Sequence, residues 1–145
     1  MRRPIQIGLT IVALGLFGAP ARTDADGGFV ILCHASNPIA NLSGSSLRKA
    51  LTGETKQWSN GAVVQVGITP LDSRELGSLA DAAGMTPPDL LSRIQQQVFK
   101  GEMRRPILLH SSAECVGLVR VSPGGICAAA AGGALPVEVK IVQVR

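Results

Sequence analysis

The chain has 145 residues, a formal charge of +4, 46% hydrophobic residues and 3% aromatic residues with no tyrosine. This length suits one domain with one hydrophobic core, which has to be mainly aliphatic. Apart from Lys100, Arg104 and Arg105 the basic residues are scattered, and no stacking aromatics accompany them, which argues against a nucleic-acid-binding surface. That short basic cluster is interpreted either as a solvated loop or as a loop that contacts an anion.

The first 21 residues have the three parts of a secretory signal peptide. Arg2 and Arg3 supply a positive start, Ile5–Gly18 is an apolar run, and Ala19–Ala21 offers the small residues that a signal peptidase reads. The apolar run is shorter than the ~20 residues of a membrane-spanning helix. We therefore expect residues 1–21 to be cleaved, and the remaining chain to be periplasmic or secreted without membrane insertion.

The next segments predict a leader, a strand and a helix. Residues 22–28 are polar, acidic and rich in glycine, and we expect a disordered leader before a domain over residues 29–145. Phe29–Cys33 is a continuous apolar run, which is typical of a strand buried on both faces. Ser43 is the expected N-cap of a helix that buries Leu47, Ala50 and Leu51 and ends at Gly53.

Capping signals predict three further helices. Asp72 with Glu75 begins one that runs to Gly84, Thr86 with Pro87 begins one that ends at Gly101, and Ser111 with Glu114 begins one that stops at Pro123. Expected strands are Ala62–Ile68, a short one at Pro106–Leu109, Gly125–Ala130, and a half-exposed one near a sheet edge at Val137–Ile141. The interleaved order predicts an α/β domain with a small mixed sheet covered by helices.

No motif in the chain indicates catalysis or metal binding. The histidines His34 and His110 could be combined with Ser36 and Asp72 only on paper, since no local nucleophile motif surrounds them. Cys33, His34, His110 and Cys115 lack the short spacings of zinc ligands. We therefore expect no enzyme activity, no metal site and no cofactor.

The three cysteines leave several pairings open. Cys115 lies in a predicted helix and Cys127 in the strand after it, at similar heights, but a helix usually packs ~10 Å from its sheet, whereas bridged Cα atoms lie within ~7 Å. Cys33 and Cys127 could pair if their strands are neighbours. Three buried thiols are the commonest alternative.

Polar helix starts are the best candidates for binding. Four polar turns lie at or before expected helix starts: Ser36–Asn37, Ser43–Ser46, Asp72–Arg74 and Ser111–Ser112. Unpaired N–H groups and a partial positive charge make a helix start suitable for an anion, and the Arg74 guanidinium could add a fork to an oxyanion. Plain capping explains most of these residues without a ligand.

An ordered set of segments resembles one known family. Phe29–Pro38 resembles the segment that enters the second lobe of phosphate-type periplasmic substrate-binding proteins, where an apolar strand ends in a similar Asn-Pro turn. Leu42–Trp58 resembles the family's next stretch, a helix followed by Gly and Trp, and Val63–Ile68 resembles the strand after it. Glu114–Ile126 resembles the later helix with its Pro-Gly turn, and Val137–Val144 resembles the returning strand.

The resemblance implies a single periplasmic-binding-protein-like lobe with a ligand cleft at helix starts. In the relatives an Arg followed by Ser-Gly-Thr binds phosphate after the second strand. The corresponding region here is Pro70–Glu75. Ser73 and Arg74 are residue types that suit phosphate, whereas Asp72 and Glu75 would repel an anion. We expect Ser36 and Ser73 to donate hydroxyls, Arg74 to neutralise charge and Asn37 to shape the turn.

Two functions follow as hypotheses. The first is an exported, non-enzymatic solute-binding domain that takes phosphate or a similar oxyanion for an ABC transport system in the envelope. The second is a periplasmic protein-interaction module that kept the fold, lost the ligand site and binds an envelope partner through an exposed strand near Val137–Ile141.

Overall fold

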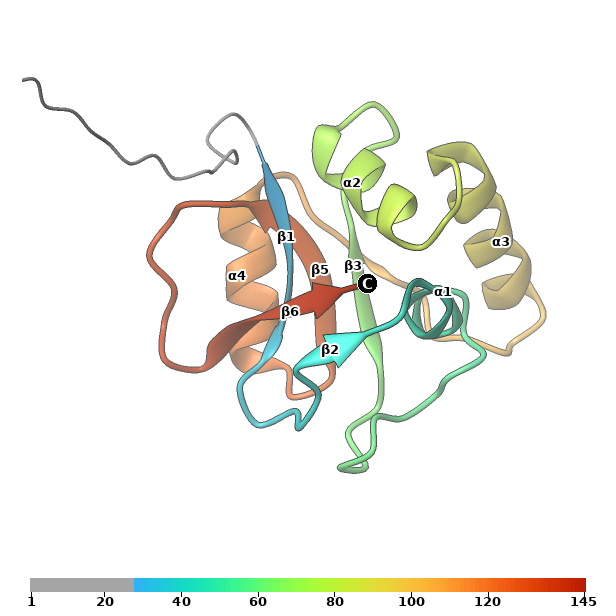
Figure 1. The fold of residues 1–145 in the computed structure, drawn as a ribbon. Coiled ribbons are helices and arrows are strands. Elements are labelled where there is room, and N and C mark those ends of the chain that lie inside the picture. The colour runs from blue at the N-terminus through green and yellow to red at the C-terminus, as the bar shows by residue number, and fades with distance from the viewer. Residues whose placement is uncertain (1–27) are drawn as a thin grey trace, which may run out of the picture.

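The computed structural model describes residues 28–145 (Figure 1). The expected signal peptide at residues 1–21 lies outside the described residues, as does all of the expected leader except Gly28. Within residues 28–145 no helix has the length and apolarity needed to cross a membrane.

The described chain is a mixed α/β fold with four helices, as the sequence predicts. The strands are β1 (Phe29–His34), β2 (Asn41–Leu42), β3 (Gln65–Ile68), β4 (Ile107–Leu108), β5 (Gly125–Ala130) and β6 (Val139–Val144). The helices are α1 (Gly44–Leu51), α2 (Arg74–Ala82), α3 (Pro87–Phe99) and α4 (Ser112–Val121).

The expected caps form at three of the four helices. The side-chain oxygens of Ser43, Thr86 and Ser111 accept backbone N–H groups at the starts of α1, α3 and α4. At α2 the prediction is wrong by one residue, because Ser73 and not Asp72 is the N-cap. Ser73 is favoured by a second bond, since its hydroxyl also donates to Thr69 Oγ1 at 2.6 Å.

The six strands form one mixed sheet in the order β2-β6-β1-β5-β3-β4. β1 is antiparallel to both β5 and β6, while β3 is parallel to β5 and to β4. The strand predicted at Val137–Ile141 begins later, at Val139, and it is flanked by β1 and by the two-residue β2. The edge strands are therefore β2 and β4.

Helices cover the sheet on two sides, as Figure 1 shows for α4 against α1, α2 and α3. On the wide side, leucines of the three helices pack on Ile31, Cys33 and Ile126. On the narrow side, α4 packs on the alternate strand residues Leu32 and Cys127. Because successive strand residues face opposite ways, both sides of β1 and β5 are buried, as the apolar run of β1 predicts.

A disulfide joins Cys115 of α4 to Cys127 of β5, and Cys33 is a buried free thiol. The two Cα atoms are 6.0 Å apart, so α4 approaches β5 more closely than the usual helix-to-sheet distance on which the sequence analysis relied. Gly125 explains the close approach, because a Cβ there would lie 3.3 Å from the Cα of Val119. β1 and β5 are neighbours, but Leu32 is the register partner of Cys127, and Cys33 faces the other side of the sheet.

Candidate functional site

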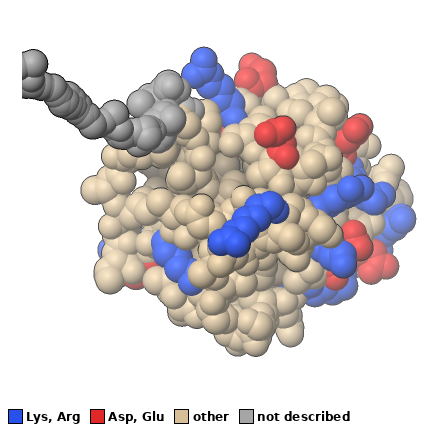
Figure 2. Space-filling view, in the orientation of Figure 1, with Lys and Arg blue, Asp and Glu red and all other residues tan. Residues whose placement is uncertain are grey.

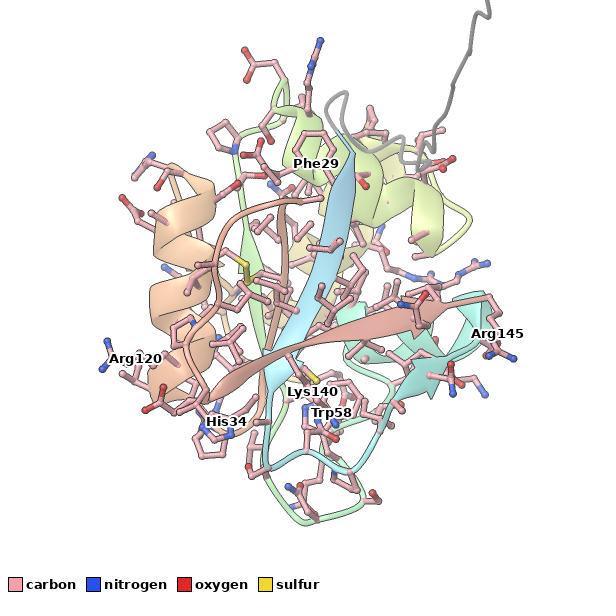
Figure 3. All side chains as sticks on the ribbon, turned by 60° about the vertical axis from the view of Figure 1, so that its left-hand side comes forward. Phe29, His34, Trp58, Arg120, Lys140 and Arg145 are labelled. Carbon is pink, nitrogen blue, oxygen red and sulfur yellow. A yellow bond between two sulfur atoms is a disulfide. The ribbon has the colours of Figure 1, made fainter. Side chains whose placement is uncertain are left out.

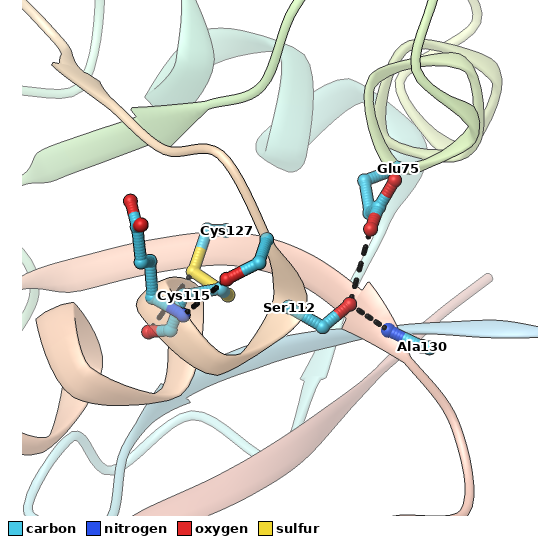
Figure 4. Close-up of a disulfide and its surroundings, with 7 residues drawn as sticks. Glu75, Ser112, Cys115, Cys127 and Ala130 are labelled. Carbon is cyan, nitrogen blue, oxygen red and sulfur yellow. Dashed lines mark hydrogen bonds between the residues drawn. A yellow bond between two sulfur atoms is a disulfide. The ribbon is translucent and has the colours of Figure 1, made fainter.

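The candidate site lies where β3 and β5 end. The two strands are parallel neighbours, so their carboxyl ends meet at the same end of the sheet. Thr69 and Ser73 follow β3 and lead into α2, while Ala130 is the last residue of β5. The start of α4 reaches the same place, because the backbone N–H of Ala130 donates to Ser112 Oγ at 2.8 Å (Figure 4).

One hydrogen bond joins the first turns of α2 and α4. Ser112 Oγ donates to Glu75 Oε2 at 3.1 Å (Figure 4). Both residues belong to first helical turns, where backbone N–H groups lack intrahelical acceptors and the helix dipole is positive. The two helix starts therefore share one carboxylate, and the half-buried Glu75 occupies the position that suits a negative charge.

The cap residues hold the two starts in place. Ser73 Oγ accepts the N–H of Leu76 at 3.2 Å, and Ser111 Oγ accepts the N–H of Glu114 at 3.2 Å. The Glu114 carboxylate accepts the N–H of His110, one residue before the N-cap, at 3.0 Å. The Ser73 hydroxyl is already used by Leu76 and Thr69. Arg74 is exposed and forms no ion pair within residues 28–145, so its guanidinium can turn toward an anion.

Ser36 and Asn37 lie at the opposite end of the sheet. β1 runs antiparallel to β5, so the turn after β1 lies beside the start of β5 and not its end. The six residues of β5 separate the two ends by roughly 17 Å at 3.4 Å per residue. In Figure 3 Phe29 marks one end of β1, and His34, Lys140 and Trp58 mark the other. Ser73 and Arg74 are brought together, whereas Ser36 and Asn37 are not brought to them.

The partners of Ser36 and Asn37 are those of a structural turn. Asn37 is fully buried, and its Oδ1 accepts the N–H of Ile39 at 3.1 Å while its carbonyl accepts from Lys140 Nζ. Ser36 Oγ is 2.8 Å from His34 Nδ1, a local contact between exposed groups. This His–Ser pair lies at the other end of the sheet from Asp72 and His110, so the four residues do not assemble into a triad.

Serine 43 caps α1 away from the candidate site. Its oxygen accepts the N–H of Ser46 at 3.0 Å. A Cβ on Gly44 would lie 3.1 Å from the carbonyl oxygen of Ala82, so the start of α1 packs on the end of α2. The nine residues of α2 place this point roughly 14 Å from Ser73 at 1.5 Å per residue. Four polar starts were candidates, and two of them, the starts of α2 and α4, meet.

Sequence reasoning missed Thr69 and the pairing of Glu75 with Ser112. Thr69 is buried, and its hydroxyl contact with Ser73 positions the start of α2. Ser112 was considered only as part of a capped start, and nothing local in the sequence places it beside Glu75, 37 residues earlier. Among residues 28–145 there is no cluster of three or more His, Cys, Asp and Glu side chains that could hold a metal ion.

The described residues form an α/β lobe in which one six-stranded mixed sheet lies between helices. No protein-family model matches the chain, and no curated protein matches it in sequence. Three solved structures match its fold over 81% of the chain. The chain spans about half the length of each of these structures, at 45–47%.

Two of the three structures are described as parts of phosphate transport. An ABC-type phosphate transport receptor from Vibrio cholerae superimposes with a TM-score of 0.61 at 16% identity, over 46% of its own chain. A putative phosphate ABC transporter substrate-binding protein from Clostridium perfringens, with bound phosphate, gives 0.61 at 16% identity over 45% of its chain. PstS from Borrelia burgdorferi gives 0.56 at 19% identity over 47%. The resemblance drawn from the sequence is thereby confirmed at the level of the fold.

Proposed function

We propose that this chain is a solute-binding lobe that takes phosphate or a similar oxyanion where α2 and α4 begin. The observation that carries the proposal is the hydrogen bond between Ser112 and Glu75, which brings two helix starts within one side-chain contact of each other. Two positive helix ends facing one point favour an anion there. The fold shared with phosphate receptors supports the same ligand class.

Each polar residue at this end has a role in the proposed site. Arg74 neutralises the charge of the oxyanion, and the free N–H groups in the first turn of α2 bind its oxygens. The Ser112 hydroxyl turns from Glu75 to the ligand. Ser73 shapes the start of α2 through its bonds to Thr69 and Leu76, so it positions the binding groups. Ser36 and Asn37, at the other end of the sheet, are assigned to the turn after β1.

Glu75 sets the limit of the affinity. Its carboxylate lies in the first turn of α2, where the anion would bind, and two like charges 4 Å apart repel each other by about 4 kcal/mol at an effective dielectric constant of 20. Phosphate must displace the carboxylate from Ser112 to bind. We therefore propose a weak, exchangeable anion site.

The same proposal covers the setting of the protein. It is exported, acts without catalysis, and passes its ligand to an ABC-type transport system in the cell envelope. Compartment and transporter rest on the expected signal peptide at residues 1–21 and on the names of the similar structures.

Calorimetric titration with inorganic phosphate tests the proposal. We expect saturable binding that is weakened about tenfold by Arg74→Ala, which removes a charge-assisted bond worth roughly 1.5 kcal/mol. Glu75→Gln should tighten binding at least tenfold, since it removes the repulsion. Arg93→Ala, an exposed position on α3, is the matched control and should leave binding unchanged.

If millimolar phosphate gives no saturable heat with either the wild-type protein or Glu75→Gln, the solute-binding proposal fails. A co-purified envelope protein would then favour the interaction module.

A further inference from the structure

A hollow of about 320 Å³ lies at the end of the sheet where β3 begins, away from the proposed solute site. Its floor is apolar and includes Val64, Val66 and Met103, and its walls are the segment after α1 and the segment between α3 and β4. A second hollow of about 290 Å³ adjoins it over Gln65 and the end of α4. Val63 and Arg104 line both hollows, so the two form one trough, here called the basic trough.

The two walls of the basic trough are held together independently of any partner. Lys56 Nζ donates to the carbonyl oxygens of Gly53 and Glu102, and it lies 3.9 Å from the Glu102 carboxylate. A Cβ on Gly53 would lie 2.8 Å from Met103 Cβ, so glycine permits the close contact of the walls. The hollow is therefore a fixed feature of the surface.

The charge around the trough is positive. The wall segments, residues 52–56 and 100–105, carry four basic and two acidic side chains. Residues 28–145 together carry eleven basic and eight acidic side chains, so the wall segments hold two of their three surplus positive charges. Figure 2 shows basic atoms with a few acidic ones on the right-hand flank, where α1 and α3 lie. No acidic side chain of the described part of the chain forms an ion pair with Arg104.

Exposed apolar side chains border the same trough. Val63 is 41% exposed and Val121 is 76% exposed, and each lines a hollow. Phe99, which is 93% exposed, precedes the basic wall segment by one residue. Arginine and exposed aromatic side chains are both enriched at protein-binding surfaces.

We propose that the basic trough binds an acidic segment of a partner protein, with one apolar side chain of that segment in the hollow over Val64 and Met103. Carboxylates of the segment pair with Arg104 and its basic neighbours, which supplies charge complementarity. The occupant is a protein segment and not an isolated ion, because the trough continues over Gln65 to Val121 and offers apolar contacts along its length. This binding is separate from the proposed solute site and can hold whether or not phosphate binds.

Amide NMR titration with a defined peptide tests this proposal. The probe is a five-residue peptide with both ends blocked, one leucine flanked by two glutamates on each side. We expect saturable shifts confined to residues 50–66, 101–105 and 121–124. Arg104→Glu should weaken binding about tenfold, whereas Arg93→Glu, with the same charge change on α3, should change it less than twofold. Both positions are exposed, so both variants should fold.

Two further probes separate the apolar from the charged contribution. Replacing the leucine of the peptide by serine should weaken binding at least fivefold, because the hollow then stays empty. Val63→Ser should weaken the leucine peptide and leave the serine peptide unchanged. Equal effects of Arg104→Glu and Arg93→Glu, equal affinity of the two peptides, shifts centred on Arg74 and Ser112, or no saturable binding would each overturn the proposal. Phosphate binding is read from different amides, so either proposal can fail alone.

Discussion

The two sides of the sheet are stabilised by different means. On the wide side three helices bury large leucines, such as Leu47, Leu79 and Leu90, each at most 1% exposed. On the narrow side α4 alone covers the sheet, and only Cys115 and Val119 of that helix are fully buried. The disulfide joins this helix to β5. The comparison indicates that a disulfide supplements apolar burial on the side where a single helix buries few side chains.

The largest effect is expected in the wide core. Leu79→Ala should lower the free energy of unfolding by about 2–5 kcal/mol, since it removes buried methyl groups and leaves a cavity. Urea unfolding measures this loss. Leu71→Ala, at a side chain that is 51% exposed, is the control and should cost less than about 0.5 kcal/mol. Similar losses for both variants would contradict the assigned core.

Removing the disulfide should have the next largest effect. Simultaneous Cys115→Ala and Cys127→Ala should cost about 3 kcal/mol, because the closed loop of 12 residues no longer restricts the unfolded chain. Urea unfolding with and without reductant checks this value, and reductant should leave the double variant unaffected. Hydrogen exchange should accelerate in α4 before α1, α2 and α3. Uniform acceleration would show that the two sides do not differ as described.

The buried thiol on the wide side should make stability depend on pH. Burial raises the pKa of Cys33 from 9.0 to about 11, with Lys140 acting in the opposite direction. The unfolded thiol ionises first, so the unfolded state binds fewer protons between pH 9 and 11 and stability falls over that window, by about 2 kcal/mol at its upper end. Cys33→Ala should remove this part of the decline. Identical pH profiles of the variant and the wild-type protein would refute the assignment.

The smallest effect is expected at the cap that holds the candidate site. Ser73→Ala should cost about 1 kcal/mol, because Leu76 loses its capping acceptor. Ser78→Ala, later in the same helix, is the matched control in thermal unfolding and should change stability by less than about 0.5 kcal/mol. A neutral Ser73→Ala would mean that Asp72 can serve as the cap after all.

Local sequence signals predicted most helices and strands, whereas contacts between distant segments determine which residues meet at the candidate site. The caps at Ser43, Thr86 and Ser111 could be found because a cap and its helix lie within four residues. The separation of Ser36 from Ser73 could not, since it depends on β1 running antiparallel to β5. The disulfide could not be predicted either, since it depends on the close packing of α4 against β5 at Gly125.

The most direct test of the account locates bound phosphate on the folded protein by amide NMR. We predict saturable shifts of the Arg74, Glu75 and Ser112 amides, with the turn at Ser36 and Asn37 unaffected. Shifts at Ser36 and Asn37, or shifts centred on Arg104, would contradict the claim that the two helix starts form the solute site.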